Sequence, residues 1–164
     1  VADAGALRRS CRDAGSAPWM RYASEDGRLM IATANHAYLD FALSWVSRVR
    51  KAGVANFAVV AMDDEILRDL QARGVPTFAM PTPLHAQELS WGGERFFARG
   101  RQTVALVRDI TACGVDLLLS DVDVAWLRDP YEFVDRYPRV DVLVSTDSLE
   151  SLNAAGGLEP CRGA

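Results

Sequence analysis

Short apolar runs alternate with amphipathic segments along most of this 164-residue chain. The runs are too short for helices, which is typical of strands that are buried on both faces. The segments between them carry apolar residues at three- and four-residue spacing, as helices that cover a sheet do. This alternation predicts an α/β domain with a mainly parallel sheet, right-handed crossovers and helices on both of its faces.

The expected elements follow one another between residues 29 and 145. Strands are expected at 29–33, 56–62, 77–80, 116–120 and 140–145, and helices at 36–52, 64–73, 94–113 and 130–136. The apolar stripe expected on the long third helix consists of Phe97, Val104, Val107 and Ile110.

Three further stretches complete the expected organisation. Residues 1–28 lack clear periodicity and are predicted to be a linker or a loosely ordered lead-in. Residues 82–93 are predicted to be a loop within a folded region at 29–150. Residues 151–164 are predicted to be a disordered tail.

Charge, hydropathy and cysteine spacing exclude several classes of protein. The net charge of −4 argues against a nucleic-acid binder, which usually carries a basic stripe. No stretch approaches the apolar length of a transmembrane helix. Cys11, Cys113 and Cys161 lie far apart with no paired spacing, which predicts neither a zinc site nor a disulfide framework. We expect Cys113 to be a small buried hydrophobic residue on a helix.

Two carboxylates one residue apart, Asp121 and Asp123, follow the strand expected at 116–120. Open α/β sheets bind ligands at the carboxyl ends of their strands, and residues i and i+2 of an extended chain point the same way. Mg²⁺ and Mn²⁺ prefer carboxylate, water and phosphate oxygens. The pair is therefore a candidate metal site, at which the cation would neutralise a diphosphate leaving group. An Asp-x-Asp also arises by chance, so its place at a strand end is what favours function.

Other strand ends offer further candidates. Thr33-Ala34-Asn35 closes the first expected strand with small residues that would let a ligand approach the backbone, although Asn35 could be a turn residue alone. Asp63 follows the second strand and could accept hydrogen bonds from a ribose or base, or could only cap the next helix. Arg101 is a candidate phosphate contact, or one more solvated arginine. No dinucleotide-binding glycine motif, P-loop or nucleophile elbow is present.

Together these segments resemble the plant and algal nucleotide-diphospho-sugar transferases, the family 77 glycosyltransferases that include extensin arabinosyltransferases and a pectin xylosyltransferase. The resemblance covers about residues 28–150. It rests on the order and spacing of the segments 32–41, 59–65, 74–76, Gly100-Arg101, 118–130 and 141–147.

The resemblance implies a GT-A fold and a UDP-sugar donor, such as UDP-arabinose or UDP-xylose, bound through Mn²⁺ or Mg²⁺. It also implies transfer to a cell-wall glycoprotein or polysaccharide in the Golgi lumen. The family's Golgi anchor and acceptor-binding half have no counterpart in this chain, so we expect a C-terminally truncated domain. The implied donor-binding residues are Thr33, Ala34 and Asn35 at the nucleoside, Asp63 at the base or ribose, Arg101 at phosphate, Asp121 toward the ribose and metal, and Asp123 on the metal.

Two alternative functions stay open, and no catalytic residue is assigned. A haloacid-dehalogenase-like phosphotransferase also places Asp-x-Asp after an apolar strand, with the first aspartate as nucleophile. Ala125, where that motif usually has Thr or Val, and the late position of the motif speak against it. A non-catalytic binding or scaffold fragment is the other alternative, and the missing acceptor half favours it.

Overall fold

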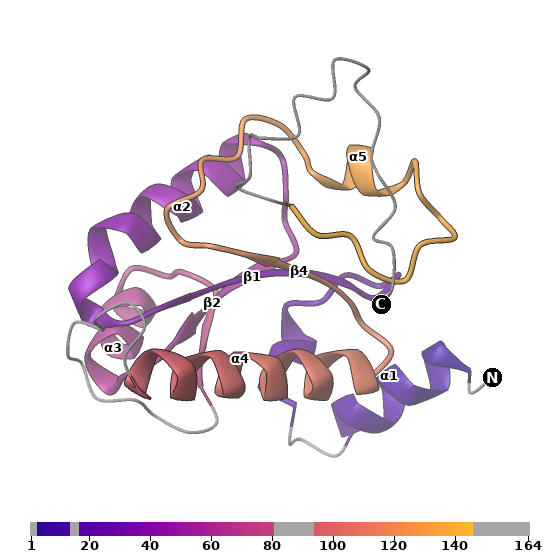
Figure 1. The fold of residues 1–164 in the computed structure, drawn as a ribbon, viewed down its shortest axis with the longest axis horizontal. Coiled ribbons are helices and arrows are strands. Elements are labelled where there is room, and N and C mark those ends of the chain that lie inside the picture. Colours follow the sequence, from indigo (N-terminus) through magenta and orange to yellow (C-terminus); the bar gives the residue numbers. More distant parts are fainter. Residues whose placement is uncertain (1–2, 14–16, 81–93, 146–164) are drawn as a thin grey trace. The chain divides into compact units, whose positions relative to one another are not determined.

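The computed structural model describes residues 3–13, 17–80 and 94–145 of the chain (Figure 1). It divides into two compact units, Val1–Pro130 and Tyr131–Ala164. The elements, with η for 3₁₀ helices, are α1 (Ala4–Asp13), η1 (Pro18–Arg21), β1 (Arg28–Ala34), η2 (His36–Tyr38), α2 (Leu39–Lys51), β2 (Phe57–Ala61), α3 (Asp64–Ala72), β3 (Thr77–Ala79), α4 (Glu94–Ala112), β4 (Asp116–Ser120) and α5 (Tyr131–Val134).

Four parallel strands form the sheet of the first unit, in the order β3-β2-β1-β4. Ile31 in the central strand β1 pairs with Ala58 of β2 on one side and with Leu119 of β4 on the other. The chain runs outward from β1 through β2 to β3 and then returns to the far side of β1. The direction of the strand order therefore reverses between β1 and β4, which is where doubly wound sheets bind their ligands.

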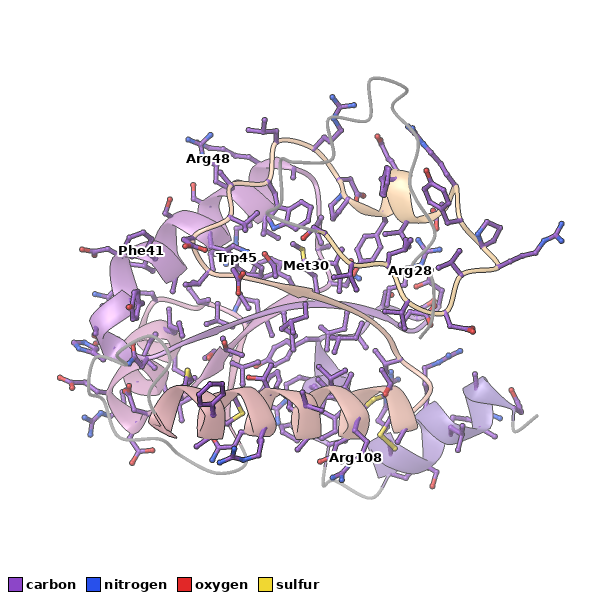
Figure 2. All side chains as sticks on the ribbon, viewed as in Figure 1. Arg28, Met30, Phe41, Trp45, Arg48 and Arg108 are labelled. Atoms are coloured by element: carbon purple, nitrogen blue, oxygen red, sulfur yellow. A yellow bond between two sulfur atoms is a disulfide. The ribbon has the colours of Figure 1, made fainter. Side chains whose placement is uncertain are left out.

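Helices cover both faces of this sheet, so the α/β class and the GT-A-like parallel arrangement expected from the sequence are confirmed. Figure 1 shows α2 and α4 on opposite sides of the strands. Figure 2 shows Met30 and Trp45 between α2 and the sheet, and the Trp45 ring packs edge-on against Phe57 with centroids 5.9 Å apart. Right-handed crossovers place α3 on the same face as α2.

The other face of the sheet holds a large hydrophobic cluster. Leu29 and Ile31 of β1 contribute to it, and Leu106 and Ile110 of α4 pack there, each at most 1% exposed. The predicted stripe of α4 is only partly right, because Ile110 is buried whereas Val104 is 69% exposed. The helix carries apolar residues on more than one side. The buried side includes Leu106 and Ile110, whereas Val104 lies on an exposed side.

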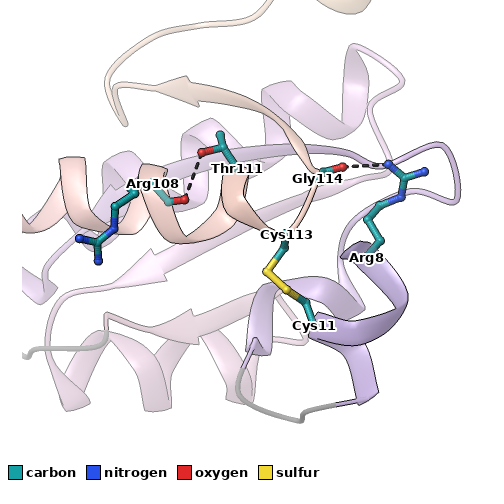
Figure 3. The surroundings of a disulfide bond; sticks show 6 residues. All are labelled: Arg8, Cys11, Arg108, Thr111, Cys113 and Gly114. Carbon is teal, nitrogen blue, oxygen red and sulfur yellow. Dashed lines mark hydrogen bonds between the residues drawn. A yellow bond between two sulfur atoms is a disulfide. The ribbon is translucent and has the colours of Figure 1, made fainter. Parts of the chain in front are cut away.

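The described residues 3–13 and 17–28 include two helices, α1 and η1, where the sequence predicted a linker or loosely ordered lead-in. A disulfide joins Cys11 of α1 to Cys113, 102 residues further along the chain (Figure 3). The Arg8 guanidinium donates a hydrogen bond of 2.8 Å to the carbonyl oxygen of Gly114. A Cβ at Gly114 would lie 2.9 Å from the carbonyl oxygen of Ala4, so the two backbones are in close contact. The expectation of unpaired cysteines was therefore wrong, because a pairing between distant segments leaves no mark in local spacing.

The short helix η1 adds two side chains to the core. Trp19 is 6% and Met20 is 2% exposed, and both belong to the cluster on the α4 side of the sheet. Full burial of a side chain of this size contributes about 1.5–3 kcal/mol. One adjacent pair of apolar residues gives no periodicity, so the sequence does not predict this contribution to the core.

The strand predicted at 140–145 is absent, and α5 is the only helix or strand among the described residues 131–145. Val142 and Val144 are 73% and 81% exposed, so in the described structure no layer covers this apolar run. The unit boundary after Pro130 also divides the folded region predicted at 29–150. The predicted loop at 82–93 and tail at 151–164 lie outside the described residues.

Candidate functional site

The candidate site lies where the loops after β1 and β4 leave the sheet side by side. Ala32 and Ser120 are the last residues paired between these two strands. Asn35 and the acidic pair therefore follow neighbouring strand ends at the point where the strand order reverses. The structure thus brings the Thr33–Asn35 segment and the Asp121–Asp123 loop to the same edge, as the sequence predicted, and Asp63 follows the adjacent strand β2.

Asp121 and Asp123 are both exposed, on a tight turn. The turn is closed by a hydrogen bond of 3.4 Å from the backbone N–H of Val124 to the carbonyl oxygen of Asp121. Neither carboxylate makes a hydrogen bond or an ion pair with the residues that the structure describes. Ionised carboxylates only accept hydrogen bonds or bind cations, so the pair offers unused acceptor oxygens to a ligand.

The hydroxyl of Ser120, directly before the acidic pair, makes three hydrogen bonds. It accepts one of 3.1 Å from the indole Nε1–H of Trp45 and one of 3.0 Å from that of Trp126. It donates one of 2.9 Å to the carbonyl oxygen of Asp121. This arrangement was not predictable from the sequence. The only available signal was a serine that ends an apolar strand, since both tryptophans come from other segments.

Asp63 serves as the N-cap of α3. Its Oδ1 accepts hydrogen bonds of 3.0 and 2.9 Å from the backbone N–H groups of Glu65 and Ile66. Its Oδ2 accepts one of 2.8 Å from the backbone N–H of His36. The capping alternative is therefore confirmed, and the same carboxylate also holds the loop that follows β1. Contact of Asp63 with a base or ribose stays a prediction.

Thr33 and Ala34 both belong to β1, which ends one residue later than predicted, and they pair with Val60 and Ala61. Together with Asn35 they are 8%, 2% and 3% exposed. Side chains buried to this degree offer little surface to a nucleoside. A ligand at this strand end would contact the backbone, as the small residues at 33–35 predict.

His36 links the loop after β1 to α3 by its side chain as well. Its Nε2–H donates a hydrogen bond of 3.0 Å to Oδ2 of Asp69, and its Nδ1 lies 3.7 Å from Oε2 of Glu65. Arg73 lies 3.5 Å from the other oxygen of Asp69. The hydrogen bond from His36, helped by the charge of Arg73, lowers the pKa of Asp69 below its ordinary value of 3.8. The sequence did not predict this group of charged side chains around His36.

Arg101 lies seven residues after the start of α4, about 10 Å along the helix axis. Its side chain is exposed and makes no hydrogen bond or ion pair with the described residues. Because α4 leads from β3 back to β4, its first residues lie toward the carboxyl edge of the sheet. The structure therefore leaves Arg101 available to a ligand without bringing it into contact with Asp121 or Asp123.

The acidic pair has the chemistry of a site for a hard cation. Two carboxylates suit Mg²⁺ or Mn²⁺, which usually take one or two carboxylates and complete their shell with water and phosphate oxygens. Over residues 3–13, 17–80 and 94–145, no group of three or more His, Cys, Asp or Glu side chains is placed to hold a metal. Two carboxylates alone would be part of a shell, so a metal site at Asp121 and Asp123 stays a prediction.

Comparison with known proteins adds evidence of descent. The nucleotide-diphospho-sugar transferase family matches residues 52–159. In Arabidopsis thaliana, the chain is similar to arabinosyltransferase XEG113, with 34% identity over 125 residues, which cover 76% of this chain and 19% of that protein. It is similar to beta-arabinofuranosyltransferase RAY1, with 32% identity over 120 residues, or 70% of this chain and 22% of that protein.

A third relative from the same plant is more distant. UDP-D-xylose:L-fucose alpha-1,3-D-xylosyltransferase MGP4 is 23% identical over 120 residues, which cover 71% of this chain and 33% of that protein. The chain thus spans about a fifth to a third of the length of these relatives. No solved structure matches it. Among the described residues, no helix combines the length and the apolar character needed to cross a membrane.

Proposed function

Because the chain belongs to the nucleotide-diphospho-sugar transferase family, we propose that it forms the donor-binding part of a glycosyltransferase. The proposed donor is a UDP-pentose such as UDP-arabinose or UDP-xylose. The names of the three relatives, which are arabinosyl- and xylosyltransferases, support a pentose. The proposed acceptor of the whole protein is a cell-wall glycoprotein or polysaccharide.

The observation that carries this proposal is the place of Asp121 and Asp123 at the reversal of strand order, with no protein partner for either carboxylate among the described residues. These two residues would hold Mn²⁺, or Mg²⁺, together with the diphosphate of the donor. Bound there, the cation supplies positive charge that stabilises the departing diphosphate. Asp121 would also face the ribose.

The other proposed donor contacts come from the neighbouring strand ends and from α4. The backbone at Thr33, Ala34 and Asn35 would receive the nucleoside. Asp63 holds that backbone in place through His36, and its one remaining lone pair would face the base or ribose. Arg101 would pair with a phosphate oxygen, since a guanidinium matches phosphate geometry with two parallel donors.

The disulfide between Cys11 and Cys113 supports a place in the secretory pathway. Disulfides form and persist in oxidising compartments and are rare in the cytosol. We accordingly propose the Golgi lumen as the working compartment, which agrees with donors and acceptors used in cell-wall synthesis.

Isothermal titration of the 164-residue chain with UDP-sugars, with and without Mn²⁺, tests the proposal. We expect Mn²⁺-dependent binding of UDP-arabinose or UDP-xylose, with weaker binding of GDP-mannose. Asp123→Asn should weaken this binding at least tenfold, since it removes a charged metal ligand. Asp116→Asn is the matched control, because Asp116 is an exposed carboxylate at the opposite end of the same strand. Absence of Mn²⁺-dependent binding, or equal binding by Asp123→Asn, would contradict the proposal.

A further inference from the structure

The hydroxyl oxygen of Ser120 is the meeting point of three segments. Trp45 of α2 and Trp126 of the segment after the acidic pair each donate a hydrogen bond to it. The Ser120 hydroxyl in turn donates one to the carbonyl oxygen of Asp121. A serine hydroxyl has one hydrogen to donate and two lone pairs to accept with. All three are used here, which fixes the orientation of the hydroxyl.

The two indole donors are themselves held in place. Trp45 is 1% exposed and packs edge-on against Phe57 of β2, so it belongs to the core between α2 and the sheet. Trp126 is partly buried and lies six residues after Ser120, so its bond folds the chain back over the acidic turn. The turn is thereby joined at both ends to a single oxygen atom that the core holds.

The backbone within the turn depends on the same hydroxyl. The carbonyl oxygen of Asp121 accepts hydrogen bonds from Ser120 Oγ and from the backbone N–H of Val124. These bonds restrain the peptide between Asp121 and Val122 against rotation. Because the carboxylates of Asp121 and Asp123 have no partner among the described residues, this backbone is what sets the positions from which the two side chains leave the turn.

We propose that Ser120 is a positioning residue, whose hydroxyl bonds to Trp45, Trp126 and the Asp121 carbonyl hold the two aspartates in the arrangement that receives a divalent cation. This role rests on the proposed function. Ser120 and the two indoles would not touch the cation but would orient the residues that bind it. Loss of such a supporting group typically weakens metal binding by about 10–100-fold.

The test compares variants of the 164-residue chain by their dissociation constant for Mn²⁺ in the presence of UDP, whose diphosphate completes the metal shell, measured by titration calorimetry. Ser120→Ala removes the hydroxyl, and we expect the dissociation constant to rise about tenfold or more. Ser120→Thr keeps the hydroxyl and should stay within about threefold of the unaltered chain. Ser47→Ala, an exposed serine on α2, is the control and should change nothing.

A second readout follows the indoles directly. The Nε1–H signals of the four tryptophans are to be recorded in ¹H–¹⁵N spectra and assigned with Trp→Phe variants. In Ser120→Ala we expect the signals of Trp45 and Trp126 to move upfield, because they lose their acceptor, and the Trp19 signal to stay. If Ser120→Ala does not fold, Trp126→Phe removes one donor from a partly buried ring and should raise the dissociation constant about threefold or more.

The outcomes separate the two proposals. Failure of the unaltered chain to bind Mn²⁺ would overturn both the proposed function and the role of Ser120. Binding by the unaltered chain and equal binding by folded Ser120→Ala would overturn only the role of Ser120. Equal binding by Trp126→Phe when Ser120→Ala is unfolded, or failure of folded Ser120→Thr to restore affinity, would overturn it as well.

Discussion

The carboxylate of Asp63 accepts a hydrogen bond from the backbone N–H of His36, which stands 27 residues earlier in the chain. The same carboxylate caps α3 through two further backbone N–H groups. One side chain thus joins the end of β2, the start of α3 and the loop after β1. Any ligand that contacts the backbone of that loop depends on Asp63 even without touching it.

Replacing this residue tests its structural share. Asp63→Ala should lower the free energy of unfolding by about 2 kcal/mol, with about 1 kcal/mol from the lost cap and about 1 kcal/mol from the lost bond to His36. Asp63→Asn should recover most of the cap, since asparagine is as good a capping residue. Urea unfolding measures both, with Asp64→Ala in the same helical turn as control. A loss under 0.5 kcal/mol for Asp63→Ala would contradict the assigned role.

The lowered pKa of Asp69 predicts how stability depends on pH. Because the pKa is depressed in the folded chain, the ionised carboxylate stabilises the fold above pH 3.8, and this contribution is lost as pH falls through the folded-state pKa. Asp69→Asn should therefore be less stable than the unaltered chain at neutral pH, with a difference that disappears at lower pH. Unfolding across pH 2–7 measures this, with Asp116→Asn as control. A difference that grows on acidification would have the wrong sign.

Reduction of the disulfide should destabilise the first unit. Cross-links that close long loops typically contribute about 2–5 kcal/mol, mainly by restricting the unfolded chain. We expect Cys11→Ser, and the unaltered chain in dithiothreitol, to melt at a lower temperature than the oxidised chain. Cys161→Ser should keep the sensitivity to dithiothreitol. Detection of free thiols on both Cys11 and Cys113 in the non-reduced protein, by alkylation and mass spectrometry, would refute the pairing.

The two faces of α4 should respond differently to truncation. Leu106→Ala removes a side chain that is 1% exposed and should cost about 2–5 kcal/mol of stability. Val104→Ala, two residues earlier on the same helix and 69% exposed, should cost less than about 0.5 kcal/mol. Thermal and urea unfolding of the two variants compare them directly. Similar losses in both would mean that a different face of α4 is buried.

The sequence predicts that α4 is a helix but does not determine which of its sides is buried. The spacing of Phe97, Val104 and Ile110 suits one helical stripe, and that of Leu106, Ile110 and Cys113 suits another equally well. The sheet beneath the helix decides between them, and periodicity contains no information about that sheet. The four strands were predictable because short apolar runs and parallel connections follow local rules, and their observed ends differ from the predicted ones by at most one residue.

Part of the candidate site was likewise predictable from local sequence, and part was not. The acidic pair and its strand end were predictable, because a run of leucines before Asp121 is a local pattern. The hydrogen bonds from Trp45 and Trp126 to Ser120 depend on how α2 and the segment after Asp123 pack against β4. This packing cannot be predicted from local sequence patterns. The apolar run at 140–145 shows the opposite error, in which a local strand pattern has no neighbouring strand in the described structure.

The link between Cys11 and Cys113 has a consequence for synthesis of the chain. A ribosome adds about 5–20 residues per second, so the thiol of Cys11 waits on the order of 5–20 s for a partner 102 residues behind it. During that interval the nascent chain carries a reactive sulfur, open to capture by other thiols. We therefore expect the order of synthesis to matter for the N-terminal helix, because its covalent link forms only after Cys113 has been made.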